Sequence, residues 1–178
     1  MKKIREKFST LRKNNQGYSM VEFIIVIAIV GIMSALGFVT INIVFSAKAS
    51  AAGNTLISQM TYLESMTKAQ DPNLAMELYF DDSESRYYIR YGTVDDAGVF
   101  TENTSIDKVS VSNSIRIFYT PTSGSRAEID SSTSVVIQFN KSDGSVKMGS
   151  GTYEVCKNKK TTGYSIALNK NTGSHYIK

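Results

Sequence analysis

The sequence has one cysteine, one histidine, two prolines and no tryptophan among its 178 residues. The single cysteine, Cys156, cannot form a disulfide within the chain, so packing and hydrogen bonds alone must hold the fold together. The single histidine, His175, leaves little material for a catalytic triad or a histidine-containing metal site, and we expect a solvated residue there. Neither common glycine-rich phosphate loop is present. We therefore expect a protein that is not an enzyme and has no cofactor, no metal and no small-molecule substrate.

Positive charge is concentrated in the first 16 residues. The chain has 20 basic and 16 acidic residues, with a formal net charge of +4. Six basic residues and one acidic residue lie in this N-terminal segment, which leaves 14 basic and 15 acidic residues elsewhere. The remainder carries a net charge of −1, which does not favour direct binding to nucleic acid. The basic run at 157–160, with Tyr153 and Tyr164 nearby, is the segment that could still contact phosphates and bases.

An uncharged apolar segment follows the basic residues. It runs from Phe23 to Ala47, 25 residues rich in Ile, Val, Ala, Phe, Met and Gly. About 20 helical residues suffice to cross a bilayer, so this segment is long enough for a transmembrane helix. Lysine and arginine ahead of a single span keep that end in the cytoplasm. We therefore expect a single-pass protein of the cytoplasmic membrane whose C-terminal part is exported.

The helical pattern continues beyond the uncharged segment and becomes one-sided. Its apolar residues recur with spacings of three and four, at Phe45, Ala49, Ala52, Leu56, Met60 and Leu63. A face of this kind must be buried against another part of the chain. We expect the packing of the helix on the rest of the protein to depend on Phe45, Ala49, Leu56, Met60 and Leu63.

The end of this helix is also predictable. Asp71-Pro72 should stop it, because the residue before a proline is disfavoured in the α region. We expect one helix from about Ser19 to about Ala69. Glycine costs roughly 1 kcal/mol in a helix relative to alanine, so the helix could bend or melt at Gly31, Gly37 and Gly53.

Residues 74–178 have the pattern of an antiparallel sheet, with short β-rich runs between clusters of Asp, Ser, Asn and Gly. The predicted strands are 74–80, 86–91, 115–119, 135–139, 146–148, 164–168 and 175–177. Glycine-containing turns at 140–144 and 169–173 should join the last two pairs of strands as hairpins. No internal repeat is evident. The expected fold class is α+β, a long N-terminal helix, transmembrane and then amphipathic, packed on a C-terminal antiparallel β-sheet head.

The most informative segment is Gly17-Tyr18-Ser19-Met20-Val21-Glu22-Phe23, in which a glycine closes the basic leader and one carboxylate stands at the entrance of the apolar span. It resembles the prepilin signal of type IV pilins and type II secretion pseudopilins. The resemblance implies that a prepilin peptidase cuts between Gly17 and Tyr18 and that the new amine of Tyr18 is methylated. It also implies that Glu22 is the acid that serves assembly. Independently, Ser19 to Glu22 fits a Ser-x-x-Glu capping box, which would start the helix locally.

This resemblance also implies an organisation and a role. The segments would be a cleaved leader at 1–17, a transmembrane and assembly helix at 18–70, and an exported head with the pilin fold at 71–178. The chain would be a structural subunit of a type IV pilus or a type II secretion-like pseudopilus. Its partners would be the prepilin peptidase and methyltransferase, other pilin or pseudopilin subunits, and the cytoplasmic membrane. The tail loosely resembles H-type minor pseudopilins, which favours a minor subunit; secretion, adhesion, motility and DNA uptake stay open as purposes.

Two alternatives to a filament subunit remain. A membrane-anchored extracellular binding module, such as an adhesin or a DNA-uptake component, would not polymerise and would bind its partner through the loops at 92–114 or 120–134. A secretory signal peptidase could instead recognise Ala47-Lys48-Ala49 before Ser50 and release a soluble β-domain. The length of the apolar span and its acidic residue are not typical of such a signal peptide.

Two local patterns have both a functional and a structural interpretation. Asp81, Asp82 and Glu84 supply oxygen ligands that Ca²⁺ prefers, but their spacing is not that of an EF-hand, and a solvated acidic turn is the simpler interpretation. Cys156 precedes the basic residue Lys157, which could lower the pKa of its thiol. A buried strand cysteine is the commoner case.

Overall fold

Helix α2 runs from Met20 to Ala69 in the computed structural model, which describes residues 19–156 and 162–177, apart from the side chains of residues 36–42 and 162. The chain forms two compact units, Met1–Asn42 and Ile43–Lys178, and α2 contributes to both. The helix ends as predicted before Pro72: the Gln70 amide donates to the Met66 carbonyl at 2.8 Å in its last turn. The prediction of one long helix is confirmed.

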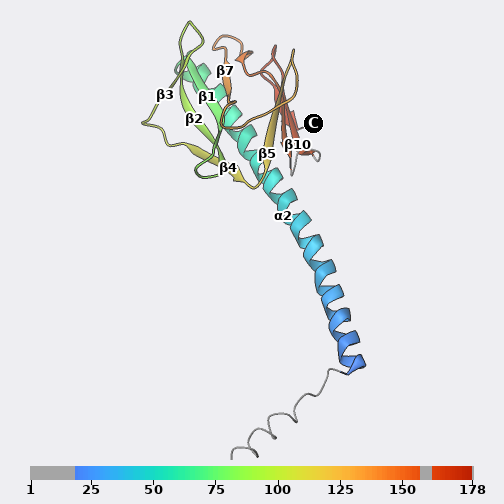
Figure 1. Ribbon diagram of the computed structural model, residues 1–178. Helices are drawn as coiled ribbons and strands as arrows, with labels where there is room; N and C mark the ends of the chain where they lie inside the picture. The colour runs from blue at the N-terminus through green and yellow to red at the C-terminus, as the bar shows by residue number, and fades with distance from the viewer. Residues whose placement is uncertain (1–18, 157–161, 178) are drawn as a thin grey trace, which may run out of the picture. The chain divides into compact units, whose positions relative to one another are not determined.

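The second unit contains two antiparallel sheets, several strands of which are labelled in Figure 1. Sheet A has the order β3 (Phe100–Glu102), β2 (Arg86–Val94), β1 (Leu74–Asp81), β7 (Val135–Phe139), β8 (Val146–Met148), with β4 (Val109–Asn113) also paired to β2. Sheet B has the order β11 (His175–Ile177), β10 (Thr162–Leu168), β9 (Gly151–Cys156), β5 (Arg116–Pro121), β6 (Ala127–Glu128). The fold is therefore α+β, but the single sheet expected from the sequence is two sheets.

The C-terminal part of α2 packs against both sheets. Its face toward sheet A meets Tyr91 of β2, whose hydroxyl donates to the side-chain oxygen of Gln59. Its face toward sheet B meets Tyr164 of β10, whose hydroxyl donates to the side-chain oxygen of Asn54 at 2.9 Å. One core forms around this part of the helix, and its largest fully buried side chains include Leu56, Met60, Leu63, Met76, Leu78, Ile89, Ile117, Ile137, Phe139, Tyr153 and Ile166.

A buried tyrosine joins the two sheets. Tyr87 of β2 donates its hydroxyl hydrogen to the carbonyl of Ile129 at 3.0 Å and accepts from the amide of Ile117 in β5 at 3.1 Å. Both bonds satisfy backbone groups that burial would otherwise leave unpaired. The Tyr87 ring also packs on Phe80 of β1, with centroids 4.9 Å apart. This residue therefore ties sheet A to sheet B.

Buried tyrosines make the head sensitive to alkali. Burial raises the pKa values of Tyr87, Tyr91 and Tyr153 above the ordinary tyrosine value. Above pH ~10 the unfolded chain releases these protons while the folded chain keeps them, so the free energy of unfolding should fall as pH rises. We expect cooperative unfolding above this pH, followed by circular dichroism together with tyrosinate absorbance. Titration of every tyrosine near its ordinary pKa while the fold persists would contradict this.

Gly53 was expected to be a weak point of the helix, and this prediction is wrong. Helix α2 is continuous through Gly53, which is buried beneath the ring of Tyr164. A Cβ atom at position 53 would lie 2.0 Å from Cδ1 of that ring. Glycine is therefore needed here for close packing of a strand residue on the helix.

The two predicted turns at 140–144 and 169–173 form hairpins with the same structure. Asn140 and Asn169 each exchange backbone hydrogen bonds with the glycine and the serine of the sequence Asn-Lys-x-x-Gly-Ser. Their glycines, Gly144 and Gly173, have φ values of +74° and +67°. The amide of Val146 donates to the carbonyl of Lys170 at 2.8 Å, so the hairpins also touch. The chain thus contains a short internal repeat that the sequence analysis missed.

Four strands of the structure were not predicted from the sequence. Strands β3 and β4 lie in the predicted loop 92–114, β6 lies in the predicted loop 120–134, and β9 follows Gly149. Strand β9 is central in sheet B, where it pairs with β5 and with β10. Its sequence, Gly-Thr-Tyr-Glu-Val-Cys, alternates between polar and apolar side chains. The glycine-rich segment before it and the lysine-rich segment after it make this short alternation difficult to recognise.

Candidate functional site

The N-terminal end of α2 is held by a capping box. The amide of Ser19 donates to Oε2 of Glu22 at 3.0 Å, and the amide of Glu22 donates to the hydroxyl of Ser19 at 3.2 Å. Two amides of the first helical turn are therefore satisfied by side chains, as the Ser-x-x-Glu pattern predicts. A carboxylate in the first turn also interacts favourably with the helix dipole.

Gly17 and Tyr18 lie outside the described residues, so the predicted cleavage and methylation positions have no structural description. The capping box starts directly after them, at Ser19. Glu22 is exposed at this position. Its carboxylate therefore has one local role, in capping, and is accessible for another.

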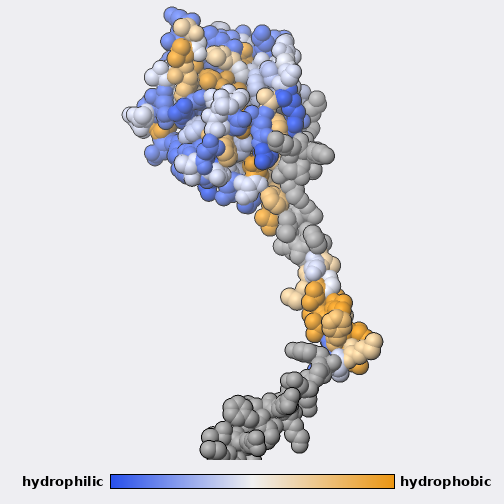
Figure 2. Space-filling model, viewed as in Figure 1, coloured by the Kyte–Doolittle hydropathy of each residue, from blue (hydrophilic) through white to orange (hydrophobic). Residues whose placement is uncertain are grey.

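The described side chains of the first unit form an apolar surface around the helix. The large apolar residues among Met20–Met33 are each more than half exposed, for example Met20 at 81% and Phe23 at 61%. Figure 2 shows them as an orange stretch of α2. Exposed apolar surface of this extent marks an interaction with lipid or protein. Among the residues that the structure describes, no helix has the length and mean hydropathy of a membrane span, so the predicted transmembrane character is not shown.

The helix residues expected to contact the head occupy the face of α2 turned toward the sheets. Ala49, Leu56, Met60 and Leu63 are buried, and Phe45 is partly buried. The helix also buries Thr67, whose hydroxyl has no hydrogen-bond partner in the described structure. The opposite face, which includes Ala51, Ser58 and Ser65, is exposed.

His175 contributes to the helix-to-sheet contact and is not the solvated residue expected from the sequence. It is partly buried on β11, with Nε2 2.7 Å from the hydroxyl of Thr61 in α2. Its Nδ1 lies 3.0 Å from the carbonyl oxygen of Gly173. The C-terminal strand is therefore tied to the helix through this ring.

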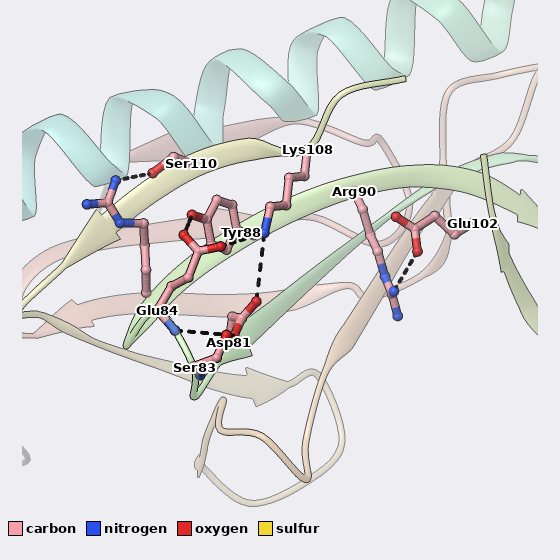
Figure 3. Close-up of polar contacts among 9 residues, drawn as sticks. Asp81, Ser83, Glu84, Tyr88, Arg90, Glu102, Lys108 and Ser110 are labelled. Atoms are coloured by element: carbon pink, nitrogen blue, oxygen red, sulfur yellow. Dashed lines mark hydrogen bonds and ion pairs between the residues drawn. The ribbon is translucent and has the colours of Figure 1, made fainter. Parts of the chain in front are cut away.

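Two carboxylates of the acidic turn between β1 and β2, those of Asp81 and Glu84, are engaged by neighbouring side chains (Figure 3). Oδ1 of Asp81 accepts hydrogen bonds from the Ser83 amide and hydroxyl, which hold the pKa of Asp81 below its usual value. Hydrogen bonds from Tyr88 and Lys108 likewise lower the pKa of Glu84. Lys108 Nζ lies 3.0 Å from Glu84 and 3.7 Å from Asp81. These carboxylates are engaged by protein groups, and the described residues contain no cluster that could hold a metal ion.

A second group of paired charges on sheet A surrounds Arg90. Arg90 of β2 lies 2.6 Å from Glu77 of β1 and 2.7 Å from Glu102 of β3. The hydroxyl of Ser134 donates to the second oxygen of Glu77. Glu77 is 8% exposed, so these bonds compensate for its removal from water. These ion pairs connect three neighbouring strands, β1, β2 and β3.

The two tyrosines considered for a contact with nucleic acid are not free to stack on bases. Tyr153 is fully buried and donates its hydroxyl hydrogen to the carbonyl of Gly149, while the ring of Tyr164 lies on Gly53. Neither ring can stack on a base. The lysines at 157–160 lie outside the described residues. Cys156 is buried on β9, with Sγ 3.4 Å from the guanidinium of Arg126, as the structural interpretation expects.

Comparison with known families supports the signal found in the sequence. Residues 12–38 match the prokaryotic N-terminal methylation motif, which is the signal of type IV pilins and pseudopilins. The match covers Gly17, Tyr18, Ser19 and Glu22 and stops before the head. No curated protein and no solved structure matches the chain. The motif is typical of pilin-like substrates of the prepilin peptidase.

Proposed function

We propose that the chain is a structural subunit, and specifically a minor one, of a type IV pilus-like or type II secretion-like filament. The observation that carries the proposal is the methylation motif at residues 12–38. Within this motif, the capping box of Ser19 and Glu22 begins helix α2. The proposed segments are the cleaved leader 1–17, the membrane and assembly helix 18–70 and the exported head 71–178. The uncharged run from Phe23 to Ala47 supports insertion in the cytoplasmic membrane before assembly.

Glu22 is proposed to drive the transfer of the helix from lipid to filament. A carboxylate on a membrane span is disfavoured by roughly 2.5–3.5 kcal/mol at the bilayer centre and by less near its edge. A cationic partner removes this penalty, and the amine of Tyr18 in a neighbouring subunit becomes available once the leader is cut. The exposed apolar surface of residues 20–33 would then be covered by neighbouring helices.

The position of Ala49 in the structure does not favour the alternative cut after this residue. Ala47-Lys48-Ala49 lies within α2, and Ala49 is buried in the head at 1% exposure. Lys48 donates from Nζ to the side-chain oxygen of Asn113 on β4. Removal of residues up to Ala49 would expose the core. The anchored binding module remains the second candidate, and it differs from a filament subunit in what it needs from Gly17 and Glu22.

Processing and assembly can be tested together by intact-mass spectrometry of membrane and sheared-surface fractions. We expect the native chain to begin at methylated Tyr18 in both fractions. Gly17→Leu should leave the chain uncut, whereas Glu22→Ala should be cut but absent from the sheared fraction. Asp96→Asn, at an exposed carboxylate of the head, should behave as the wild type. An uncut native chain, or sheared filaments that contain Glu22→Ala, would contradict the proposal.

The two roles of Glu22 can be separated by a second pair of variants. Glu22→Gln keeps an oxygen that can accept the hydrogen bond of the capping box but removes the charge. Ser19→Ala removes one capping bond and keeps the charge. If the charge drives assembly, Glu22→Gln should fail to assemble and Ser19→Ala should assemble; the reverse result would assign Glu22 to capping alone.

A further inference from the structure

A hollow of about 450 Å³ lies on sheet B, on the face away from the core. Thr120, Thr152, Ala167 and Tyr176 are direct neighbours across β5, β9, β10 and β11, and all four border it. The residues that alternate with them, such as Tyr153 and Ile166, are fully buried, so the row points outward. Ala167 is small and lies between Thr152 and Tyr176, which leaves a depression there. The turn 169–171 borders the hollow as well.

Several polar side chains of this hollow have no hydrogen-bond partner among the described residues. Within the described part of the chain, no hydrogen bond or ion pair engages the side chains of Thr120, Thr152, Lys170, Asn171 or Tyr176. On sheet A, by contrast, the charged network around Arg90 and Lys108 is internally paired. These five side chains are therefore available to a ligand, whereas the Thr122 hydroxyl and the Asn169 side-chain oxygen, which also border the hollow, are engaged within the head.

The chemistry of the lining selects a ligand class. Two threonine hydroxyls and one asparagine amide can both donate and accept hydrogen bonds, which suits the hydroxyl groups of a sugar. The Tyr176 side chain is 53% exposed and offers an aromatic surface, on which the apolar C–H face of a pyranose ring can pack. Lys170 is the only charged residue of the lining, so a ligand carboxylate meets a cation and no anion. A nucleic acid would need several cations along its backbone, and the lining supplies one.

We propose that this hollow binds an acidic sugar residue of an extracellular polysaccharide. Its volume lies within the range of roughly 300–1,000 Å³ found for small-molecule sites. Tyr176 packs on the ring, Lys170 pairs with the carboxylate, and the hydroxyls of Thr120 and Thr152 with the amide of Asn171 bind the sugar hydroxyls. The inference goes beyond the filament role and needs only that the head is exported.

The test is calorimetric titration of the full chain, in a detergent without a sugar headgroup, with tri-galacturonate and with maltotriose. We expect tri-galacturonate to bind with a dissociation constant on the order of 1 mM or lower, and maltotriose to bind more weakly. Tyr176→Ala should weaken binding about tenfold. Tyr176→Phe should keep it, because the ring remains. Lys170→Gln should remove the preference for the acidic trisaccharide.

Lys147→Gln is the matched control for Lys170→Gln, because Lys147 is an exposed lysine that lies outside the hollow. In the β7–β8 hairpin it occupies the position that Tyr176 has in the β10–β11 hairpin. The Lys147→Gln variant loses the same charge as Lys170→Gln and should bind as the wild type. Circular dichroism of each variant establishes folding.

No binding of either trisaccharide to the folded wild type, or equal loss in Lys147→Gln and Lys170→Gln, would overturn the proposal. Oligodeoxythymidine that binds with the same variant losses, while both trisaccharides fail, would reassign the hollow to single-stranded DNA. Because filament assembly is not needed for this titration, its failure leaves the proposed function untouched.

Discussion

Leu56→Asp is expected to prevent the head from folding while leaving the N-terminal part of the helix intact. Leu56 is fully buried between α2 and the sheets. Loss of a buried leucine side chain alone costs about 2–5 kcal/mol, and an unpaired carboxylate in its place adds several more. Small domains have a free energy of unfolding of only about 5–15 kcal/mol. Met60→Asp should have the same effect, since Met60 is equally buried.

The measurement is limited proteolysis of the full chain in membranes, with membrane association followed in parallel. The wild-type head should persist as a resistant fragment, and the Leu56→Asp head should be degraded. Ser58→Asp is the matched control, because Ser58 is two residues away on the exposed face of the same helix. A resistant head in Leu56→Asp, or equal degradation in both variants, would show that the face with Leu56 does not hold the head together.

Gly173→Ala is expected to cause the second largest loss of stability. Gly173 has φ +67°, and a Cβ atom there would lie 2.0 Å from the carbonyl oxygen of Gly144 in the other hairpin. The contact is with backbone, so no side chain can rotate away. A left-handed conformation costs roughly 1–2 kcal/mol for a residue with a Cβ, and the steric overlap adds about 1–3 kcal/mol.

Gly98→Ala separates the two contributions. Gly98 also has a positive φ, +82°, but a Cβ atom there would have nothing within 4 Å. Urea unfolding of the full chain in detergent should show a loss of about 1–2 kcal/mol for Gly98→Ala and a clearly larger loss for Gly173→Ala. Equal losses would mean that the two hairpins do not pack on each other as described.

The helix could be predicted because its determinants are close in sequence. The Ser19 to Glu22 capping box, the stripe from Ala49 to Leu63 and the stop before Pro72 each depend on residues within a few positions of one another. The strands could be predicted only where alternation and turn residues coincide, as at 135–148. Strand β9 was missed because its pairing with β5 and β10, and not its local sequence, makes it a strand.

The errors concern contacts between distant segments. Gly53 was expected to weaken the helix, yet Tyr164, more than a hundred residues later, packs on it. His175 was expected in solvent, yet it contacts Thr61. Tyr153 and Tyr164 were considered for base stacking, yet both rings are engaged in the head. In each case a residue's role depends on a partner that a periodicity within one element cannot identify.

The sequence by itself determined the methylation motif, the uncharged span and the start and end of the helix, because capping, hydropathy and proline geometry act over a few residues. Only the tertiary structure decided that the head has two sheets joined through Tyr87, that the hairpins at Gly144 and Gly173 pack together, and that Thr120, Lys170 and Tyr176 border one hollow. The physical reason is that strand pairing and side-chain packing bring together residues whose separation along the chain carries no local signal.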